Sequence, residues 1–296
     1  MFSELQLKIA IESGIQGIQA SLVKLQDFAH NYTEAEDAIG ASIVVPTYDF
    51  SGAAAFNAST NNYAGGSNEV GGVVINLSSH YVKSVSMTDR DLAETGINWL
   101  KDSSIGIGRV LGASIQSGFF AAVKSGASAT RTAEIDTTSA KTIAALYKAC
   151  ADNNMPVENC VVVLNQGVYS EILGNLPYGT YASDEAVKFG RVPGLFGFKA
   201  VICSTLLGVD ADEEPIVGYI IAEGSVGLAS RYLKPMDGAY PDTFKAVDPD
   251  SGLTIGYRSF CDLATGKRFL AGEVLMGFGV TNQKGIVTLE LPEATT

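Results

Sequence analysis

The sequence is poor in basic residues and in long hydrophobic runs. Its 296 residues include 20 Lys and Arg against 32 Asp and Glu, for a formal net charge of −12. Nucleic-acid backbones and anionic membranes are bound through basic side chains, so this balance argues against a dedicated nucleic-acid binder and against a polybasic membrane-docking protein. Nothing approaches the roughly 18 consecutive apolar residues of a spanning helix. We also expect no signal peptide at the N-terminus, because no basic patch leads into an apolar stretch there.

Residues that commonly carry chemistry are scarce. There are two histidines, His30 and His80, and neither has a metal-ligand partner at a useful spacing, so we interpret both as structural or surface residues. The four cysteines are widely spaced, and no two of them form a Cys-x-x-Cys pair: Cys150, Cys160, Cys203 and Cys261. Free thiols in a reducing compartment are the expected state.

Four short patterns resemble functional motifs, and each has a simpler explanation. Gly106–Gly112 reads G-x-G-x-x-x-G, but a helical segment precedes it instead of the strand that a dinucleotide loop requires. Ser21 and Lys24 match Ser-x-x-Lys without the companion elements of acyl-enzyme hydrolases. Asp248–Gly252 resembles the start of a calcium loop but lacks its final Glu, and residues 210–214 read as a solvated acidic turn with weak cation binding as the alternative. We therefore predict no catalytic, cofactor-binding or metal-binding residues.

What is present is a globular composition. Apolar residues make up 46% of the chain and charged residues 18%, which is enough for a sizeable core in one large domain or two ordinary ones. Residues 3–29 are expected to form a helix, because a single apolar stripe includes Ile11, Ile15, Ile18, Leu22 and Leu25. Two glycines inside this helix weaken it, so it requires a partner surface, either in its own domain or on a neighbouring subunit.

Residues 42–86 are expected to form a long hairpin. Residues 43–50 and 71–85 read as its two strands, and the tip between them is rich in Gly, Ala, Ser and Asn. No Lys or Arg occurs from Leu25 to Val82. Because an isolated hairpin is only marginally stable, the tip is either a floppy loop or a segment ordered by another chain.

One long helix is expected over residues 86–126. Ser86 or Thr88 would cap it, a break is possible near Asp102–Ser104, and its glycines would allow other backbone to approach closely. Helix and strand then alternate over 137–233, with helices at 137–153 and 166–174 and strands at 160–164 and within 193–205 and 215–222. Residues 235–252 read as an exposed, turn-rich excursion. Strands at 253–263, 269–281 and 285–291 complete the chain.

The order of these parts resembles the major capsid protein of tailed bacteriophages, which has the Hong Kong 97-type capsid fold. Segments similar to that family are NCVVVLNQGVYSEIL, GRVPGLFGFKAVICSTL and VGYIIAEGSVGLASRYLKP. The resemblance covers nearly the whole chain and implies an α+β fold. Its parts would be an N-terminal arm at 1–42, an extended hairpin loop at 43–85, a spine helix of the peripheral domain at 86–130, an axial domain that takes most of 131–233, and a return to the peripheral-domain sheet at 234–296.

The resemblance implies a structural protein and not an enzyme. The chain would assemble with itself, as hexamers and pentamers, into an icosahedral shell that encloses double-stranded DNA without binding it specifically. Portal and scaffolding or decoration proteins would be partners, no membrane or cofactor would be involved, and the protein would be made in the host cytoplasm and reside in the virion. Two alternatives stay open: the shell of an encapsulin nanocompartment, and a soluble α/β enzyme with an unrecognised site.

Two departures from that family lead to expectations. No long scaffolding segment precedes the arm, so a separate scaffolding protein or none is expected. Some family members cross-link a loop lysine to a neighbour's asparagine, but residues 51–72 contain no lysine. We therefore predict a non-covalent shell, which denaturing electrophoresis of particles checks: a single band is expected, and a covalent ladder would refute it.

We expect the first third of the chain to become ordered only across neighbouring copies. Fixing a backbone costs about 1–2 kcal/mol per residue, and the arm and hairpin have little to pack on within themselves. Contacts between chains would supply the missing stabilisation.

Overall fold

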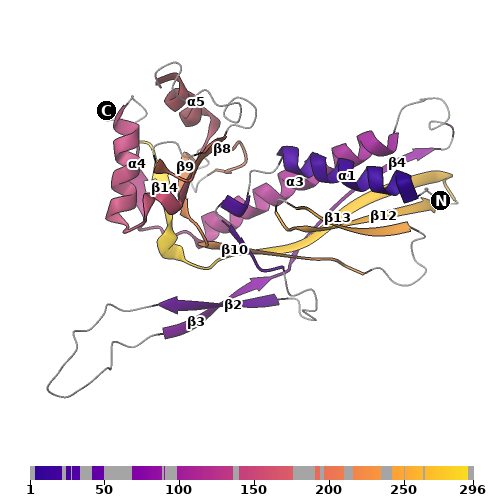
Figure 1. The fold of residues 1–296 in the computed structure, drawn as a ribbon, viewed down its shortest axis with the longest axis horizontal. Coiled ribbons are helices and arrows are strands. Elements are labelled where there is room, and N and C mark those ends of the chain that lie inside the picture. The colour runs from indigo at the N-terminus through magenta and orange to yellow at the C-terminus, as the bar shows by residue number, and fades with distance from the viewer. Residues whose placement is uncertain are drawn as a thin grey trace.

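The computed structural model describes residues 4–21, 25–27, 29–33, 42–49, 69–88, 90, 99–135, 140–175, 191–193, 197–209, 216–234, 242–249, 251–262 and 264–292. Figure 1 shows an elongated body in which helices lie along one sheet, a second lobe at one end, and a two-stranded ribbon that projects from the body. Helices and strands are mixed throughout, which is the expected α+β class.

The larger sheet is built around one long strand, β13. Its order is β1 (Ala29–Asn31), β10 (Val226–Arg231), β13 (Lys267–Val280), β12 (Thr254–Asp262) and β11 (Asp242–Val247), and β4 (Ser79–Thr88) also pairs with β13. Side chains alternate along β13, and Leu270, Val274 and Met276 are buried in the main core. One face of this sheet therefore requires a cover.

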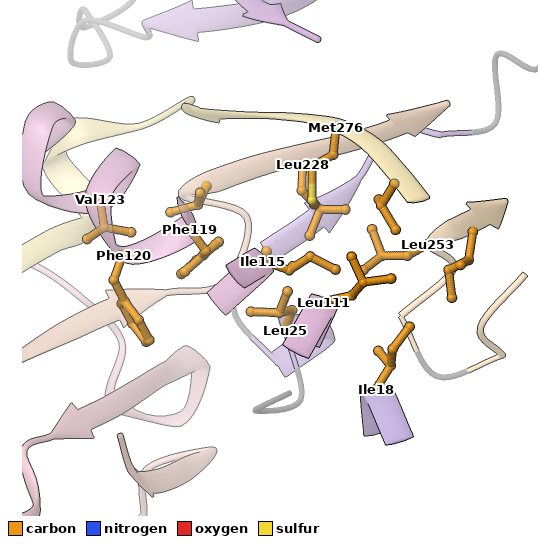
Figure 2. Packing of buried hydrophobic residues seen from close by; sticks show 14 of the residues in the cluster. Ile18, Leu25, Leu111, Ile115, Phe119, Phe120, Val123, Leu228, Leu253 and Met276 are labelled. Atoms are coloured by element: carbon orange, nitrogen blue, oxygen red, sulfur yellow. The ribbon is translucent and has the colours of Figure 1, made fainter. Parts of the chain in front are cut away.

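Two helices supply that cover. Helix α3 (Trp99–Gly126) buries a large apolar side chain at every fourth position, from Ile107 through Leu111, Ile115 and Phe119 to Val123. Helix α1 (Glu4–Ser21) packs alongside α3, and the short 3₁₀ turn η1 (Leu25–Asp27) follows it. Figure 2 shows side chains of both helices in one cluster with residues of the sheet.

The second sheet forms the smaller lobe. Its order is β5 (Thr132–Glu134), β14 (Ile286–Glu290), β9 (Gly218–Ala222), β6 (Cys160–Leu164), β8 (Ala200–Cys203) and β7 (Arg191–Pro193). A second core lies between this sheet and the helices α4 (Ala140–Asp152) and α5 (Gln166–Asn175). On the opposite face of the sheet, Val161, Val163 and Ile202 belong to the main core, so the main core contains residues of both lobes.

The first expected helix is shorter than its apolar stripe suggested. Helix α1 ends at Ser21, and the chain then continues through η1 into β1, which pairs in parallel with β10. Ile18 and Leu25 are both buried in the main core (Figure 2). The expectation that the first third of the chain is ordered only on neighbouring copies is wrong for residues 4–21 and 29–33, because the chain's own α3 and β10 hold them. It is also wrong around Ile75, which is buried against the chain's own sheet.

The second strand of the expected hairpin is divided. Strands β2 (Ser42–Asp49) and β3 (Glu69–Asn76) form the predicted antiparallel pair, in which Ser42 lies opposite Asn76. The ladder stops at Leu77, whose side chain is buried beside Ala229. Beyond it β4 pairs with β13 instead, so 71–85 is two strands in two sheets. The hairpin tip falls among residues that the structure does not describe.

The long helix differs from its expected start. Ser86 and Thr88 pair with β13 as part of β4, so neither lies at the start of α3, which begins at Trp99. Helix α3 is continuous through Asp102–Ser104, where the Ser104 hydroxyl donates to the Leu100 carbonyl oxygen at 2.7 Å. Because that bond satisfies the serine inside the helix, no break is needed there.

Two further expectations on sheet membership need correction, and one strand within 131–233 belongs to the other sheet. Residues 242–247, within the expected excursion, are the edge strand β11, and Phe244 packs on the main core. Strand β14 belongs to the second sheet and not to the sheet of β11–β13, while β10 leaves the 131–233 segment for the larger sheet. Apolar side chains explain the positions of β14 and β10. On β14, Ile286 is buried in the main core and Val287 in the second core, and on β10, Val226 and Leu228 are buried in the main core. The predicted strand at 160–164 is confirmed, and the predicted strand at 253–263 and helix at 166–174 are found as β12 (Thr254–Asp262) and α5 (Gln166–Asn175).

Candidate assembly surfaces

The β2–β3 ribbon is anchored to the larger sheet by Ile75. This side chain is fully buried and packs against three glycines of the sheet, Gly227, Gly277 and Gly279. A Cβ added to Gly279 would lie 3.0 Å from Ile75 Cγ1, one added to Gly227 would lie 2.7 Å from its Cδ1, and one added to Gly277 would overlap the Asn76 carbonyl oxygen. Because these glycines have no side chain, the ribbon can approach the backbone of the sheet closely.

We expect Ile75→Ala to destabilise the protein by about 2–5 kcal/mol, because it removes a buried branched side chain above residues that cannot fill the space. Chemical denaturation of the purified chain measures the loss. Val74→Ala is the matched control, since Val74 is exposed next to Ile75, and a change within about 0.5 kcal/mol is expected. Equal losses in the two variants would show that Ile75 is not the anchor.

The opposite face of the ribbon is apolar and uncovered by the described residues. Val44 and Val74 lie directly opposite each other in the ladder, with 63% and 51% of their surface exposed. Next to them Pro46 pairs with Gly72, and both are exposed. Figure 1 shows the ribbon of β2 and β3 extending away from the body. A projecting apolar pair is typical of a surface that another chain covers.

An ionic cluster supports the sheet at the base of this ribbon. Glu273 on β13 is 7% exposed and accepts a 2.7 Å hydrogen bond from Nε of Arg258, whose Nη2 also contacts the same carboxylate oxygen. The other oxygen lies 3.3 Å from Nε2 of His80 on β4. The cluster therefore ties together three neighbouring strands, β12, β13 and β4.

We expect Glu273→Gln to cost about 3 kcal/mol, because it leaves the largely buried Arg258 guanidinium without its counter-charge. Thermal or chemical denaturation measures this loss. The surface pair Lys199–Glu223 is the control: its Nζ and Oε2 atoms are 3.0 Å apart, but Glu223 is exposed, so Glu223→Gln is expected to cost less than about 1 kcal/mol. Similar losses in both variants would contradict the importance of burial here.

A close crossing between α1 and α3 fixes the N-terminal helix. A Cβ added to Gly108 would overlap the Gly14 carbonyl oxygen and lie 3.0 Å from the Ile18 nitrogen. A Cβ on Gly17 would likewise overlap the Ile105 carbonyl oxygen, and one on Gly14 would overlap the buried Tyr257 hydroxyl. The glycines that weaken α1 as an isolated helix therefore let its backbone touch α3.

The residues considered for catalysis do not come together. His30 lies on β1, where its ring contacts Tyr32 edge-on with centroids 4.6 Å apart, and His80 belongs to the ionic cluster on β4. Gly106–Gly112 lies within α3, where glycines allow close helix packing. A dinucleotide-binding loop would instead lie between a strand and a helix. Ser21 ends α1, whereas Lys24 and residues 210–214 lie outside the described residues.

The calcium-like segment is a turn. Asp248 is buried, and its carboxylate accepts hydrogen bonds from the Ser251 nitrogen at 3.1 Å and from Nε2 of Gln19 at 2.9 Å. Gly252 adopts a φ of +66°, which favours glycine, and its nitrogen donates to the Asp248 carbonyl oxygen at 2.7 Å. The turn thereby connects β11 to β12 and also holds α1.

Two searches for other kinds of site were negative. Within the described residues, no three His, Cys, Asp or Glu side chains gather so as to hold a metal ion. Among the helices that the structure describes, none combines the length and hydrophobicity needed to cross a bilayer.

Sequence alone did not indicate the surroundings of two cysteines. Cys150 near the end of α4 and Cys160 at the start of β6 are both buried in the second core, and the Cys160 thiol donates to the Pro156 carbonyl oxygen at 3.2 Å. The other two cysteines lie on β8 and β12, where Cys203 is partly buried and Cys261 is exposed. The useful signal was the apolar strand beginning at Cys160, which had to pack against the preceding helix.

Comparison with known proteins gives matches in structure alone. No family model and no curated protein sequence matches the chain. The capsid protein of Ralstonia phage GP4 superposes with a TM-score of 0.66 at 10% identity, covering 94% of this chain and 93% of that one. The capsid of the cyanophage P-SCSP1u gives 0.63 at 15% identity, covering 92% and 89%. A virus-like particle from Pyrococcus furiosus gives 0.51 at 11% identity, covering 97% and 100%. Over nearly its whole length, the chain has the capsid fold of tailed bacteriophages.

Proposed function

We propose that this chain is a major capsid protein that assembles with itself into the icosahedral shell around packaged double-stranded DNA. The observation that carries the proposal is the capsid fold, which extends over more than nine-tenths of the chain in the phage GP4 comparison. The projecting ribbon with its exposed valine pair supports it, because a shell protein needs apolar surface that only another copy covers.

Each region has a role in this proposal. The ribbon of β2 and β3 is the stem of the extended loop at 43–85, α3 is the spine helix within 86–130, and the larger sheet is the peripheral domain. The second sheet with α4 and α5 is the axial domain, which takes β14 from the last segment in addition to strands from 131–233. We assign α1 and β1 to the body, since both pack there.

The shell does its work by contact and not by catalysis. The net charge of −12 suits a shell that encloses DNA without binding it tightly, because each basic side chain in contact with a phosphate would add affinity for DNA. In this proposal the protein is made in the host cytoplasm, resides in the virion as hexamers and pentamers, and meets portal and scaffolding or decoration proteins there.

One alternative has its own supporting observation. The similarity to a virus-like particle from Pyrococcus furiosus covers 97% of this chain, and an encapsulin-type nanocompartment would use the same architecture. The phage comparisons have higher TM-scores, 0.66 and 0.63 against 0.51, so the viral shell is preferred. Neighbouring genes separate the two: terminase and portal genes support the viral shell, and a gene for an enclosed enzyme supports the nanocompartment.

The proposal is tested by expressing the full chain and examining it by size-exclusion chromatography and negative-stain microscopy. Closed particles of megadalton mass are expected, if necessary with a co-expressed scaffolding protein. A monodisperse monomer or small oligomer under all of these conditions would overturn the shell function and favour a soluble protein.

A further inference from the structure

We propose that β4 is a further assembly surface, at which it pairs antiparallel with β4 of a second copy in a register centred on Val82. The two larger sheets then continue into each other across a two-fold axis. The proposal rests on the self-assembly proposed above and names one contact within it. The ribbon takes no part in this contact, so the two surfaces have separate tests.

Strand β4 lies at an edge of the larger sheet. Both β4 and β12 pair with residues 267–273 of β13, so they occupy opposite sides of that strand. Within the described residues, β13 is the one strand that pairs with β4. The backbone groups on the outer side of this ten-residue strand therefore form a template on which another strand can pair.

The other edge strands that the structure describes are less suited to pairing. Strands β1, β5 and β7 have three residues each, and β11 has six. In the ribbon, Pro46 of β2 has no N–H to donate, and Gly71 and Gly72 weaken β3. By contrast, β4 contains no proline, glycine or acidic residue. Copies with a net charge of −12 repel one another, so a strand without acidic side chains is a favourable place for them to meet.

Two-fold symmetry restricts the register of this pairing. Side chains on the same face of the joined sheet must meet, so the axis passes through one residue position of β4. A register centred on Lys83 would set two ammonium groups opposite each other, which is unfavourable. A register centred on Val82 instead places Lys83 opposite Tyr81 of the second copy, and Ser84 opposite His80 of the second copy.

The exposure of Val82 favours the register centred on it. Its side chain is 55% exposed in the single chain, whereas Val85, on the other face of β4, packs on the main core. In this register, residues 79–85 of the two copies pair, and the two exposed valines cover each other at the axis. A register centred on Ser84 would place two hydroxyls at the axis and Val82 opposite Ser86, so it would bury less apolar surface.

The first test places one cysteine at the axis of the full-length chain carrying Cys261→Ser, which removes the exposed native thiol. Facing residues of an antiparallel pair have Cα atoms about 4.5–5.5 Å apart, within the range of a disulfide. Val82→Cys should therefore give disulfide-linked dimers when oxidised with copper–phenanthroline, as measured by non-reducing electrophoresis.

Ser84→Cys, in the same background, is the matched control. Ser84 is also exposed, but in this register the two Ser84 positions lie four residues apart along the strands, about 13 Å, which is too far for a disulfide. We expect about tenfold less linked dimer from Ser84→Cys than from Val82→Cys. Equal or greater linkage through Ser84→Cys, or no linkage through either cysteine, would overturn the proposal.

The second test uses charge at the same position. Val82→Asp and Val82→Lys should each lower particle yield about tenfold, because identical charges would face each other at the axis. An equal mixture of the two variants should restore the yield, since an aspartate can then face a lysine. Negative-stain microscopy measures the yield, and circular dichroism checks folding. Normal particles from each single variant would overturn the β4 contact alone, whereas a parent chain that never self-associates would overturn the shell function as well.

Discussion

Replacing the exposed valine pair of the ribbon by Val44→Lys and Val74→Lys is expected to abolish closed particles while the subunit stays folded. These side chains are 63% and 51% exposed in the single chain, so charging them costs the fold little. In a shell, the same lysines would have to be buried unpaired against a neighbour, at a cost of several kcal/mol for each contact. Because every subunit repeats the contact, we expect particle yield to fall at least tenfold. Light scattering and negative-stain microscopy measure it, with circular dichroism to check folding.

Two companion variants sharpen this result. Val110→Lys changes a valine of α3 that is 45% exposed and away from the ribbon, and it is expected to leave assembly intact. Deleting residues 52–70 removes the hairpin tip and the first two residues of β3, and it should give folded subunits that form no closed particles. Normal particles from both the double lysine variant and the deletion would show that the ribbon is not an assembly element.

Gly108→Val is expected to separate α1 from α3 and to destabilise the body by about 3 kcal/mol or more. The added Cβ would overlap the Gly14 carbonyl oxygen, and backbone atoms of two packed helices cannot yield as a flexible side chain does. Hydrogen exchange should show faster exchange along α1, and chemical denaturation measures the loss of stability.

Gly106→Ala in the same helix is the matched control. No atom lies within 4 Å of the Cβ it would add, and the residue is exposed, so the gain in helix propensity should stabilise the protein by up to about 1 kcal/mol. Destabilisation of similar size in the two variants would mean that glycine is required for helix geometry and not for the α1–α3 contact.

Local pattern was enough to predict most individual elements. The buried strand at Cys160–Leu164 and the helix that follows it are continuous in apolar content or in period, so they could be located from their own residues. The β2–β3 pair was equally readable, because two runs of strand-forming residues flank a glycine-rich segment. The order of these parts carried the resemblance to capsid proteins.

Contacts between distant residues could not be read in the same way. Nothing local indicates that the strand ladder changes partner near Leu77, where the chain leaves β2 and joins β13, and Leu77 is buried in a cluster with Ala229, far away in the sequence. The packing of α1 depends on Gly108, about ninety positions away, so the sequence left open whether its partner was this chain or another. The burial of Cys150 and Cys160 in one core was hidden, because it depends on a tight reversal of the chain between them that neither cysteine encodes.

Electron cryomicroscopy of the assembled shell tests the role of the ribbon most directly. The maps should show the face that carries Val44 and Val74 covered by a neighbouring copy of the chain, with α1 still packed on α3 of its own subunit. A shell in which this valine pair faces solvent in every subunit, or in which the ribbon folds back on its own body, would contradict the proposed assembly.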